Sequence, residues 1–179
     1  MYELNYNQGR MKKLLFAIYA LLLLATSGCT VKYTLSGASI PPDAKTFSVA
    51  YFPNNAPMVA PILSSTLTDE LTQRFASRTR LVQVPEGGDL AFEGEIVGYT
   101  SVTSSVSSGE YALQNRLTIT VKVTFTNVID EKASFKARSF SAYADYDSTK
   151  LLNEVESTLI PEIVEQLVTD IFMAAASNW

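Results

Sequence analysis

The sequence predicts an α/β (α+β) domain, a two-layer sandwich in which a mixed, mainly antiparallel sheet of four to five strands carries two helices on one face. Three observations support this prediction. Residues 61–77 and 152–176 each show an apolar stripe at helical spacing. Segments that alternate apolar and polar residues lie before and between them, as in strands with one buried face. The opposite side of these strands is rich in Thr, Lys and Glu, so the helices should cover only one face.

The first half of the chain predicts a strand, a helix and a second strand. Alternation across Thr46–Phe52 places apolar side chains on one strand face, at Phe47, Val49 and Tyr51. After a proline-rich break, a helix is expected from Pro61 to Ser77, because apolar residues recur every four positions, at Leu63, Leu67, Leu71 and Phe75. A short strand at 81–84 follows. Such a unit should form a right-handed crossover with its two strands parallel.

The second half predicts three further strands and a long helix. Leu90–Thr100 has apolar residues on one face, and residues 117–126 alternate strictly between apolar residues and Thr or Lys. A polar turn and a returning strand at 133–143 complete a β-hairpin. These strands should join the sheet antiparallel. In the final helix, Pro161 predicts a kink or a restart near Ile160.

The N-terminal region has the pattern of a signal peptide with a lipobox. Lys12 and Lys13 precede an apolar run, Leu14–Ala25, and small residues then lead to Cys29. The run is shorter than the roughly 20 apolar residues that span a bilayer. We therefore expect the signal to be removed, with residues 1–10 as its upstream extension.

Cys29 has two interpretations. It is either a small residue at an ordinary secretory cleavage site or the residue on which a covalent lipid is built. Thr26 stands where a lipobox normally carries Leu, but no second cysteine exists to form a disulfide or share a metal, which favours lipidation. The predicted organisation is a signal peptide at 1–28, a lipidated tether at 29–45 and a single domain at 46–179.

The net charge of the chain after residue 28 and the identity of residue 30 indicate which partners and which membrane to expect. Residues 1–28 hold three basic residues and one acidic residue, so the rest of the chain carries 11 basic and 17 acidic residues, a formal net charge of −6. A nucleic-acid surface is therefore not expected. Thr30 occupies the position at which an Asp retains lipoproteins in the inner membrane. We expect a lipid anchor in the outer membrane, with the protein facing the periplasm.

Two groups of basic residues are candidate contact sites. The first lies near the end of the first helix, where it either complements the helix dipole or binds an anionic ligand or partner. It consists of Arg74, Arg78 and Arg80. The second lies on the hairpin, where it either protects a sheet edge by charge or contacts a phosphate-rich lipid. It consists of Lys122, Lys136 and Arg138, which could lie near one another on the open face.

Two pairs of carboxylates have both a structural and a chemical interpretation. Glu93 and Glu95 either line a solvated strand face or carry out acid–base chemistry. Asp145 and Asp147 either cap the start of the last helix or bind a metal. The chain has no histidine and no recognisable Ser-Lys or phosphate-loop pattern. We therefore expect no catalytic residue, no metal and no cofactor except the lipid on Cys29.

Several spaced segments resemble the LptE family of lipopolysaccharide-assembly lipoproteins. The resemblance covers nearly all of the chain after Cys29 and rests on the order of the segments. They are Ser36–Pro42, Val49–Asn54, Asp89–Gly98, Arg116–Ile119, Tyr143–Tyr146 and Asn178–Trp179.

The resemblance implies a plug within the lumen of a large outer-membrane β-barrel, LptD, which the protein helps to fold and through which lipopolysaccharide reaches the cell surface. It also implies that basic residues contact lipopolysaccharide. No motif assigns these residues, so the candidates follow from charge alone: Arg80, Lys122, Lys136 and Arg138.

A different class of envelope lipoprotein is the alternative. Small α/β lipoproteins that activate peptidoglycan synthases, or that form secretion-type oligomers, also begin with a strand and a helix. They also have an acidic residue leading a glycine-containing strand, as Asp89–Gly94 does here. The partner that co-purifies with the protein distinguishes the two classes.

Overall fold

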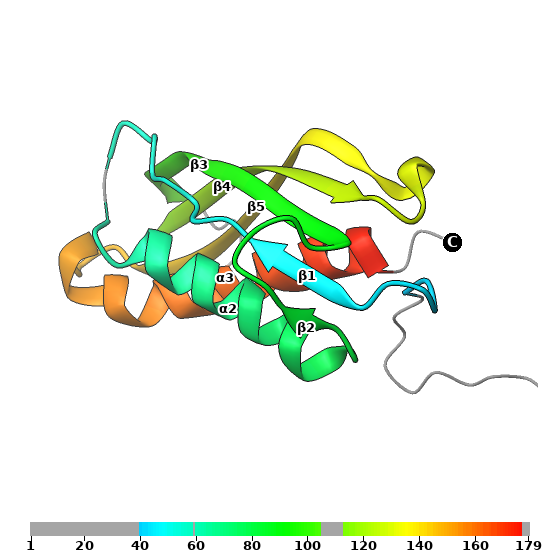
Figure 1. Cartoon of the computed structure of the whole chain (residues 1–179). Helices are drawn as coiled ribbons and strands as arrows, with labels where there is room; N and C mark the ends of the chain where they lie inside the picture. Colours follow the sequence, from blue (N-terminus) through cyan, green and yellow to red (C-terminus); the bar gives the residue numbers. More distant parts are fainter. Residues whose placement is uncertain (1–39, 59, 105–112, 177–179) are drawn as a thin grey trace, which may run out of the picture. The chain divides into compact units, whose positions relative to one another are not determined.

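The chain divides into two units, residues 1–33 and 34–179, and all the residues that the structure describes belong to the second. The structure is a computed structural model and describes residues 40–58, 60–104 and 113–176. The elements are β1 (Thr46–Val49), α2 (Leu63–Arg78), β2 (Val82–Gln83), β3 (Leu90–Ser104), β4 (Gln114–Asn127), the 3-10 helix η1 (Glu131–Ala133), β5 (Phe135–Asp147) and α3 (Leu152–Ala176) (Figure 1).

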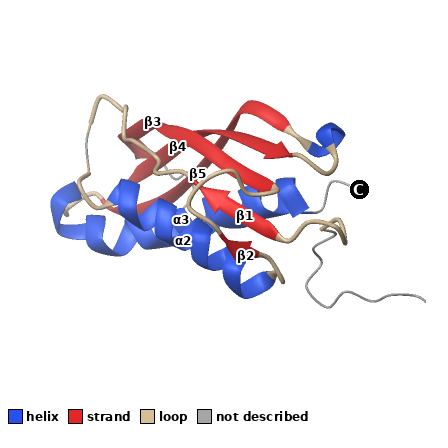
Figure 2. Cartoon of the chain, viewed as in Figure 1, coloured by secondary structure: helices blue, strands red, loops and turns tan. Residues whose placement is uncertain are grey.

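The strands form one five-stranded sheet in the order β2-β1-β3-β4-β5, and both helices lie on the same side of it (Figures 1 and 2). The predicted fold class is thus confirmed. The parallel pairing of β1 with β2 and the β4–β5 hairpin are also confirmed. The prediction that every later strand joins antiparallel is wrong at one point, because β3 pairs with β1 in parallel.

The connection between β2 and β3 explains this parallel pairing. Gly88 crosses against β1, where its N–H donates to Ser48 Oγ at 3.2 Å. A Cβ on Gly88 would lie 2.6 Å from the Phe47 carbonyl carbon, so only glycine fits this crossing. The Asp89 carboxylate then accepts hydrogen bonds from the backbone N–H groups of Lys45 (2.8 Å) and Thr46 (3.0 Å). After this crossing, β3 lies on the opposite side of β1 from β2 and runs parallel to both.

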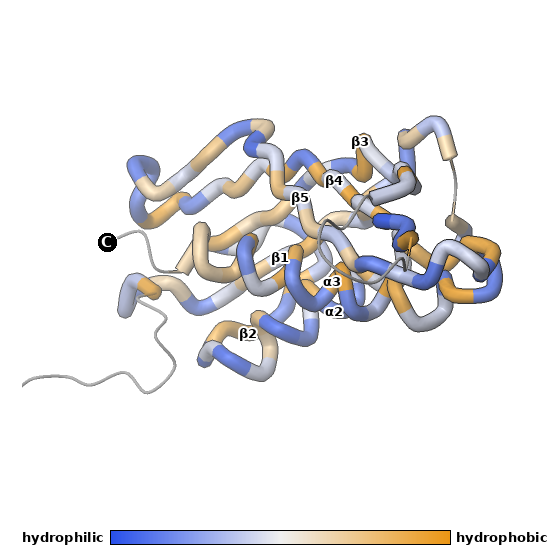
Figure 3. The backbone as a smooth tube through the Cα atoms, turned by 180° about the vertical axis from the view of Figure 1, so that it is seen from behind, coloured by the Kyte–Doolittle hydropathy of each residue, from blue (hydrophilic) through white to orange (hydrophobic). Residues whose placement is uncertain are grey.

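The core fills the space between the sheet and the helices. On β4 every second side chain is fully buried, as the alternation predicted, at Leu117, Ile119, Val121, Val123 and Phe125. The hydropathy along the strands can be followed in Figure 3. The four apolar residues predicted for α2 are also fully buried. Phe75 joins the layers, since its ring centroid lies 4.6 Å from that of Phe92 and 4.9 Å from that of Phe172. Burial of each such side chain contributes about 1.5–3 kcal/mol.

The alternation predicted for the first strand fails after Val49, where β1 ends. Tyr51 is 63% exposed, whereas Phe52 is fully buried. The reason is a tertiary contact: the Phe52 N–H donates to Thr68 Oγ1 of α2 at 3.2 Å, and the Phe52 ring packs where Gly94 has no side chain. The chain turns its aromatic residue into the core at this point.

The last helix continues through Pro161 from Leu152 to Ala176, so the predicted restart near Ile160 is wrong. Buried residues on both sides of the proline lie on one stripe, and their packing outweighs the hydrogen bond that the proline removes. Asp147 does not cap the helix: its carboxylate accepts from the N–H and hydroxyl of Thr149 in the preceding turn. Within the described ranges, no helix is long and apolar enough to cross a membrane.

Candidate functional site: the outer face of the sheet

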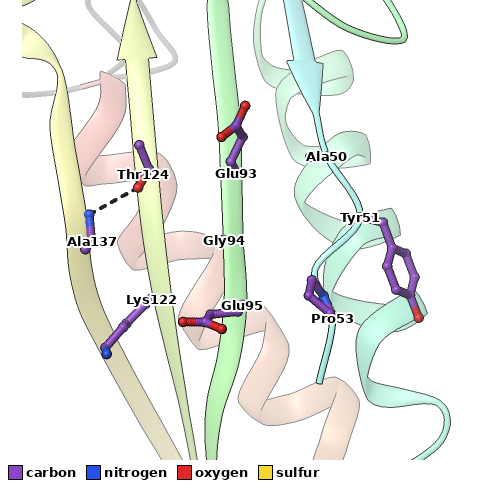
Figure 4. Close-up of a pocket in the computed structure, with 9 residues that line it drawn as sticks. All are labelled: Ala50, Tyr51, Pro53, Glu93, Gly94, Glu95, Lys122, Thr124 and Ala137. Atoms are coloured by element: carbon purple, nitrogen blue, oxygen red, sulfur yellow. Dashed lines mark hydrogen bonds between the residues drawn. The ribbon is translucent and has the colours of Figure 1, made fainter. Parts of the chain in front are cut away.

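The helices cover one face of the sheet, and we call the opposite face of β3, β4 and β5 the outer face (Figure 1). Part of it forms a shallow hollow of about 440 Å³, the outer hollow, beside the segment that follows β1 (Figure 4). The lining residues are Ala50, Tyr51, Pro53, Glu93, Gly94, Glu95, Lys122, Thr124 and Ala137. The hollow combines an exposed aromatic ring with both signs of charge.

The charged groups of the outer hollow come from neighbouring strands. Glu95 of β3 lies opposite Lys122 of β4 in the register of the sheet. Its carboxylate also accepts a hydrogen bond of 2.6 Å from Asn55 Nδ2, which lies on the segment after β1. Glu93, two residues earlier on the same face, is exposed. These contacts agree with the interpretation of both glutamates as members of a solvated strand face.

A second polar cluster lies on the outer face where β4 pairs with β5. Arg116 forms a two-pronged ion pair with Asp145, with Nε–Oδ1 and Nη2–Oδ2 distances of 2.7 and 2.9 Å. The guanidinium also stacks on the ring of Tyr143, 3.7 Å from the ring centroid. The hydrogen bond from Arg116 lowers the pKa of Asp145, and the same bond raises the pKa of Arg116. Both groups therefore stay charged.

Arg116 and Tyr143 were not among the predicted site residues, and Asp145 was predicted only as a helix cap or a metal ligand. Arg116 and Asp145 lie opposite each other in the register, on either side of the hairpin turn and at nearly equal distances from it. That spacing, with opposite charges, is the signal in the sequence that points to the pair. The sequence alone leaves the register open, because a bulge in either strand would shift it.

The predicted basic group on the hairpin is divided between two faces. Lys122 lines the outer hollow, whereas the Arg138 guanidinium lies over the rings of Phe135 and Phe140, at 5.6 and 5.2 Å from their centroids. Arg138 also lines a hollow with residues of α3, on the covered side of the sheet. Lys136 is exposed and lies at an irregularity in the pairing of β4 with β5. The structure therefore does not bring the three residues together on the open face.

A bulge in β5 accounts for this division. The register shifts between Val123 and Phe125 of β4, and Ala137 has a φ of 47°. Two residues of β5, Lys136 and Ala137, lie across from the single residue Thr124, whose hydroxyl accepts from the Ala137 N–H. The alternation of side chains thus changes just before Arg138.

Two of the three arginines predicted as a group at the end of α2 form hydrogen bonds within the protein. Arg80 donates to the Pro41 carbonyl at 2.7 Å. Arg74 donates to Glu70 and to Thr169 Oγ1 of α3. Arg78 lies in the last turn of α2 and is exposed, as a cation that complements the helix dipole.

The remaining predicted residues have the following positions. Asp145 is engaged with Arg116 and Asp147 with Thr149, and no group of three or more His, Cys, Asp or Glu residues in the described part of the chain could hold a metal ion. Cys29, the predicted lipidation site, lies outside the described residues. Its lipid, and the contact roles of Arg80 and the hairpin residues, stay predictions.

Several solved structures of bacterial proteins are similar to this chain. The hypothetical protein CT253 from Chlamydia trachomatis has a TM-score of 0.50 at 11% identity, over 75% of this chain and 99% of its own. A minor lipoprotein from Acinetobacter baumannii has a TM-score of 0.46 at 15% identity, over 74% and 94%. Lipoprotein B from Nitrosomonas europaea has a TM-score of 0.44 at 12% identity, over 82% and 91%. At 11% identity, the match to CT253 shows a similar fold and nothing more.

Sequence comparison identifies the family. No curated protein matches the chain in sequence. The family model described as "LptE: Lipopolysaccharide-assembly" matches residues 44–175, which include the sheet, α2 and nearly all of α3. The chain therefore belongs to the LptE family of lipopolysaccharide-assembly lipoproteins.

Proposed function

We propose that the protein is a non-enzymatic outer-membrane lipoprotein that plugs the LptD β-barrel, helps it to assemble and so supports transport of lipopolysaccharide to the cell surface. The observation that carries the proposal is the family match over residues 44–175. The polar outer face of β3, β4 and β5, which neither α2 nor α3 covers, provides a surface for such a partner.

The composition of the outer face supports a protein interface. Tyr51 is 63% exposed and Tyr143 is 49% exposed, and Arg116 stacks on the latter. Tyr and Arg are the residue types that most often dominate binding energy at interfaces. The polar groups around them are already held in place, as in the 3.1 Å contact between the hydroxyls of Thr120 and Ser141. Since the interior of a large outer-membrane barrel is polar, this face matches it in character.

Any contact with lipopolysaccharide phosphates would be local, because the chain after residue 28 has a formal charge of −6. Lys122 is the candidate that lies in the outer hollow. Lys136 is exposed on the same hairpin, whereas Arg138 and Arg80 have partners within the chain. We propose Lys122 and Lys136 as the first two residues to test.

The membrane attachment is proposed to be a lipid on Cys29, in the outer membrane and facing the periplasm. Each buried methylene of an acyl chain adds about 0.8 kcal/mol to membrane binding, so several chains give a stable anchor. Cells fed a labelled fatty acid should label the wild type but not Cys29→Ala. Label retained on Cys29→Ala would show that the lipid is elsewhere.

Purification from detergent-solubilised outer membranes tests the proposed partner. A large β-barrel should co-purify with the protein, and depletion of the protein should lower lipopolysaccharide at the cell surface. Recovery of a penicillin-binding protein, or of a homo-oligomeric ring, would instead support the alternative class of envelope lipoprotein. Absence of a barrel together with unchanged surface lipopolysaccharide would refute the proposal.

A further inference from the structure

We infer that the free edge of β5 is a site at which an extended polypeptide segment with basic side chains adds as a further strand. The site differs from the outer face to which the proposed function assigns a partner, and it does not depend on that function. Four features of the structure support it: the position of β5, the direction of its backbone groups, the shape of the surface below it and the charge of α3.

The first feature is the position and length of β5. In the sheet that the described residues form, β5 is the last strand in the order β2-β1-β3-β4-β5, and it runs from Phe135 to Asp147. The bulge at Ala137 limits the regular edge at one end, and the turn after Asp147 limits it at the other. The regular part in between is longer than the average strand of about five to six residues.

The second feature is the direction of the backbone groups. In an antiparallel pair, the N–H and C=O of alternate residues point to the partner strand, and those of the others point away. The Tyr143 carbonyl points away from β4, since it accepts from Gln166 Nε2 of α3 at 3.5 Å. By this alternation, the backbone groups of Ser139, Ser141 and Asp145 also face the free edge. They form a row that an added strand can pair with.

The third feature is the surface between this edge and α3. A hollow of about 460 Å³ lies there, lined by Arg138, Ser139, Phe140, Ser141, Asp170, Met173 and Ala174. A second hollow of about 460 Å³ continues along α3, lined by Glu162, Glu165, Gln166, Thr169 and Asp170. Every second side chain of a strand added to β5 would point toward these hollows.

The fourth feature is charge, which defines the partner. α3 contains five carboxylate residues and no Lys or Arg. Three of the five line the two hollows, namely Glu162, Glu165 and Asp170. In the first hollow Arg138 offsets the charge of Asp170, whereas the charged residues that line the second hollow are all carboxylates. The segment that fits this edge therefore carries Lys or Arg at the positions that face the second hollow. The long hydrogen bond from Gln166 to Tyr143 would be replaced by a backbone N–H of the added strand.

A peptide that alternates Thr and Lys, as long as β5, is the probe for this site. Added to the protein purified from membranes in detergent, it should bind and slow the hydrogen exchange of the Ser139, Ser141 and Tyr143 amides. A peptide that alternates Thr and Glu should not bind. Binding of the basic peptide should weaken at higher salt, because the carboxylates of α3 are exposed.

Two variants separate strand pairing from charge attraction. Ser139→Pro removes one edge N–H and blocks strand addition without removing a bond to β4, and it should weaken peptide binding by about tenfold or more. Ser139→Thr, which keeps the N–H, is its matched control and should bind like the wild type. Glu165→Lys with Asp170→Lys leaves the edge intact and should also weaken binding.

The outcomes distinguish the inference from its alternatives. Equal binding by the wild type and by the Glu165→Lys, Asp170→Lys variant would overturn the assignment of a basic partner. Unchanged edge exchange with bound peptide would show that the peptide binds elsewhere. If sedimentation shows a dimer whose β5 amides are already protected without peptide, the edge is occupied by a second copy and the inference is wrong. Weaker peptide binding by Ser139→Pro supports strand addition only if the variant is folded, as shown by cooperative thermal unfolding.

Discussion

At the scale of single residues, Gly94 shows how closely the chain segments approach each other in the sheet. A Cβ at this position would contact the Lys122 carbonyl oxygen and would lie 2.5 Å from Cε1 of the Phe52 ring. The first contact is with backbone, which cannot rotate away, and the second is with a fully buried ring. Glycine at 94 is therefore required for Phe52 to turn into the core.

Gly94→Ala should consequently destabilise the fold. Overpacking of a filled site typically costs about 1–3 kcal/mol, and we expect a loss of that size in the free energy of unfolding, measured by urea denaturation. Gly98→Ala is the matched control: its Cβ would lie 3.0 Å from Thr120 Cβ on the solvent-facing side of the sheet, and its nearest backbone atom, the Thr120 nitrogen, would be 3.7 Å away. Equal stability of both variants would show that Phe52 can repack.

Asp89 predicts a pH dependence at the same scale. Its pKa lies below the ordinary aspartate value of 3.8, chiefly because its carboxylate accepts from the Lys45 and Thr46 N–H groups. Since the folded-state pKa is the lower one, the stabilisation is complete above the unfolded-state pKa. It is lost as the pH falls through the folded-state pKa.

Asp89→Asn should therefore lower stability at neutral pH and lose less of its remaining stability than the wild type below about pH 4. The measurement is the urea midpoint as a function of pH. Asp69→Asn, on the exposed side of α2, is the control for the loss of one negative charge and should keep the urea midpoint of the wild type at neutral pH. A parallel acid limb for Asp89→Asn and the wild type would contradict the role of this carboxylate.

At the scale of elements, α3 contains a proline, which disfavours a helix interior, beside a stripe of buried apolar residues that stabilises the helix. Pro161 is exposed and lacks the N–H that would bond to the Ser157 carbonyl. The helix survives because its neighbours Ile160, Ile163 and Val164 are fully buried on the sheet side. Tertiary packing here outweighs a local preference.

Replacement of this proline should therefore stabilise the protein. Pro161→Ala restores a backbone donor in an exposed helix interior, and we expect a gain of up to about 3 kcal/mol, measured as a rise in the midpoint of thermal unfolding. Glu162→Ala, the exposed neighbour with its N–H intact, should change stability little. A decrease for Pro161→Ala would mean that the proline shapes the helix to fit the sheet.

The same scale shows how much of the fold the sequence could predict. β4 was predicted correctly because strict alternation requires only a sheet with one buried face, and α2 because its apolar stripe is regular. Both signals are local. The parallel pairing of β3 with β1 depends on the crossing at Gly88, which is a contact between distant segments and leaves no periodicity in the sequence.

The candidate site was predictable only in part, for the same reason. The polar character of the outer face follows from alternation, and so does the placement of Glu93 and Glu95 on it. The position of Arg138 does not, because the bulge at Ala137 moves its side chain to the α3 side of the sheet. The pairing of Arg116 with Asp145 likewise requires a register that only the assembled hairpin defines.

At the scale of the described domain, its two layers present different surfaces to a partner. The outer face carries aromatic and charged groups held by hydrogen bonds, whereas the exposed side of α3 carries carboxylates and hydroxyls. If the proposed barrel encloses the protein, the protein interface holds the complex and the lipid on Cys29 is a secondary tether. Cys29→Ala should then still bind the barrel in a pull-down, although it no longer carries the lipid.

The same argument predicts which surface variants release the barrel. Arg116→Ala combined with Tyr143→Ala removes the stacked pair from the outer face, and we expect recovery of the barrel to fall by more than about tenfold, as at an interface hot spot. Arg78→Ala on α2 removes an exposed arginine from the helix layer and is the matched control, which should recover the barrel normally.

Because the Arg116–Asp145 ion pair is partly exposed, its loss should leave the protein folded, which thermal unfolding can verify. If instead Arg78→Ala releases the barrel and the double variant does not, the helix layer is the binding surface and the proposed orientation is wrong.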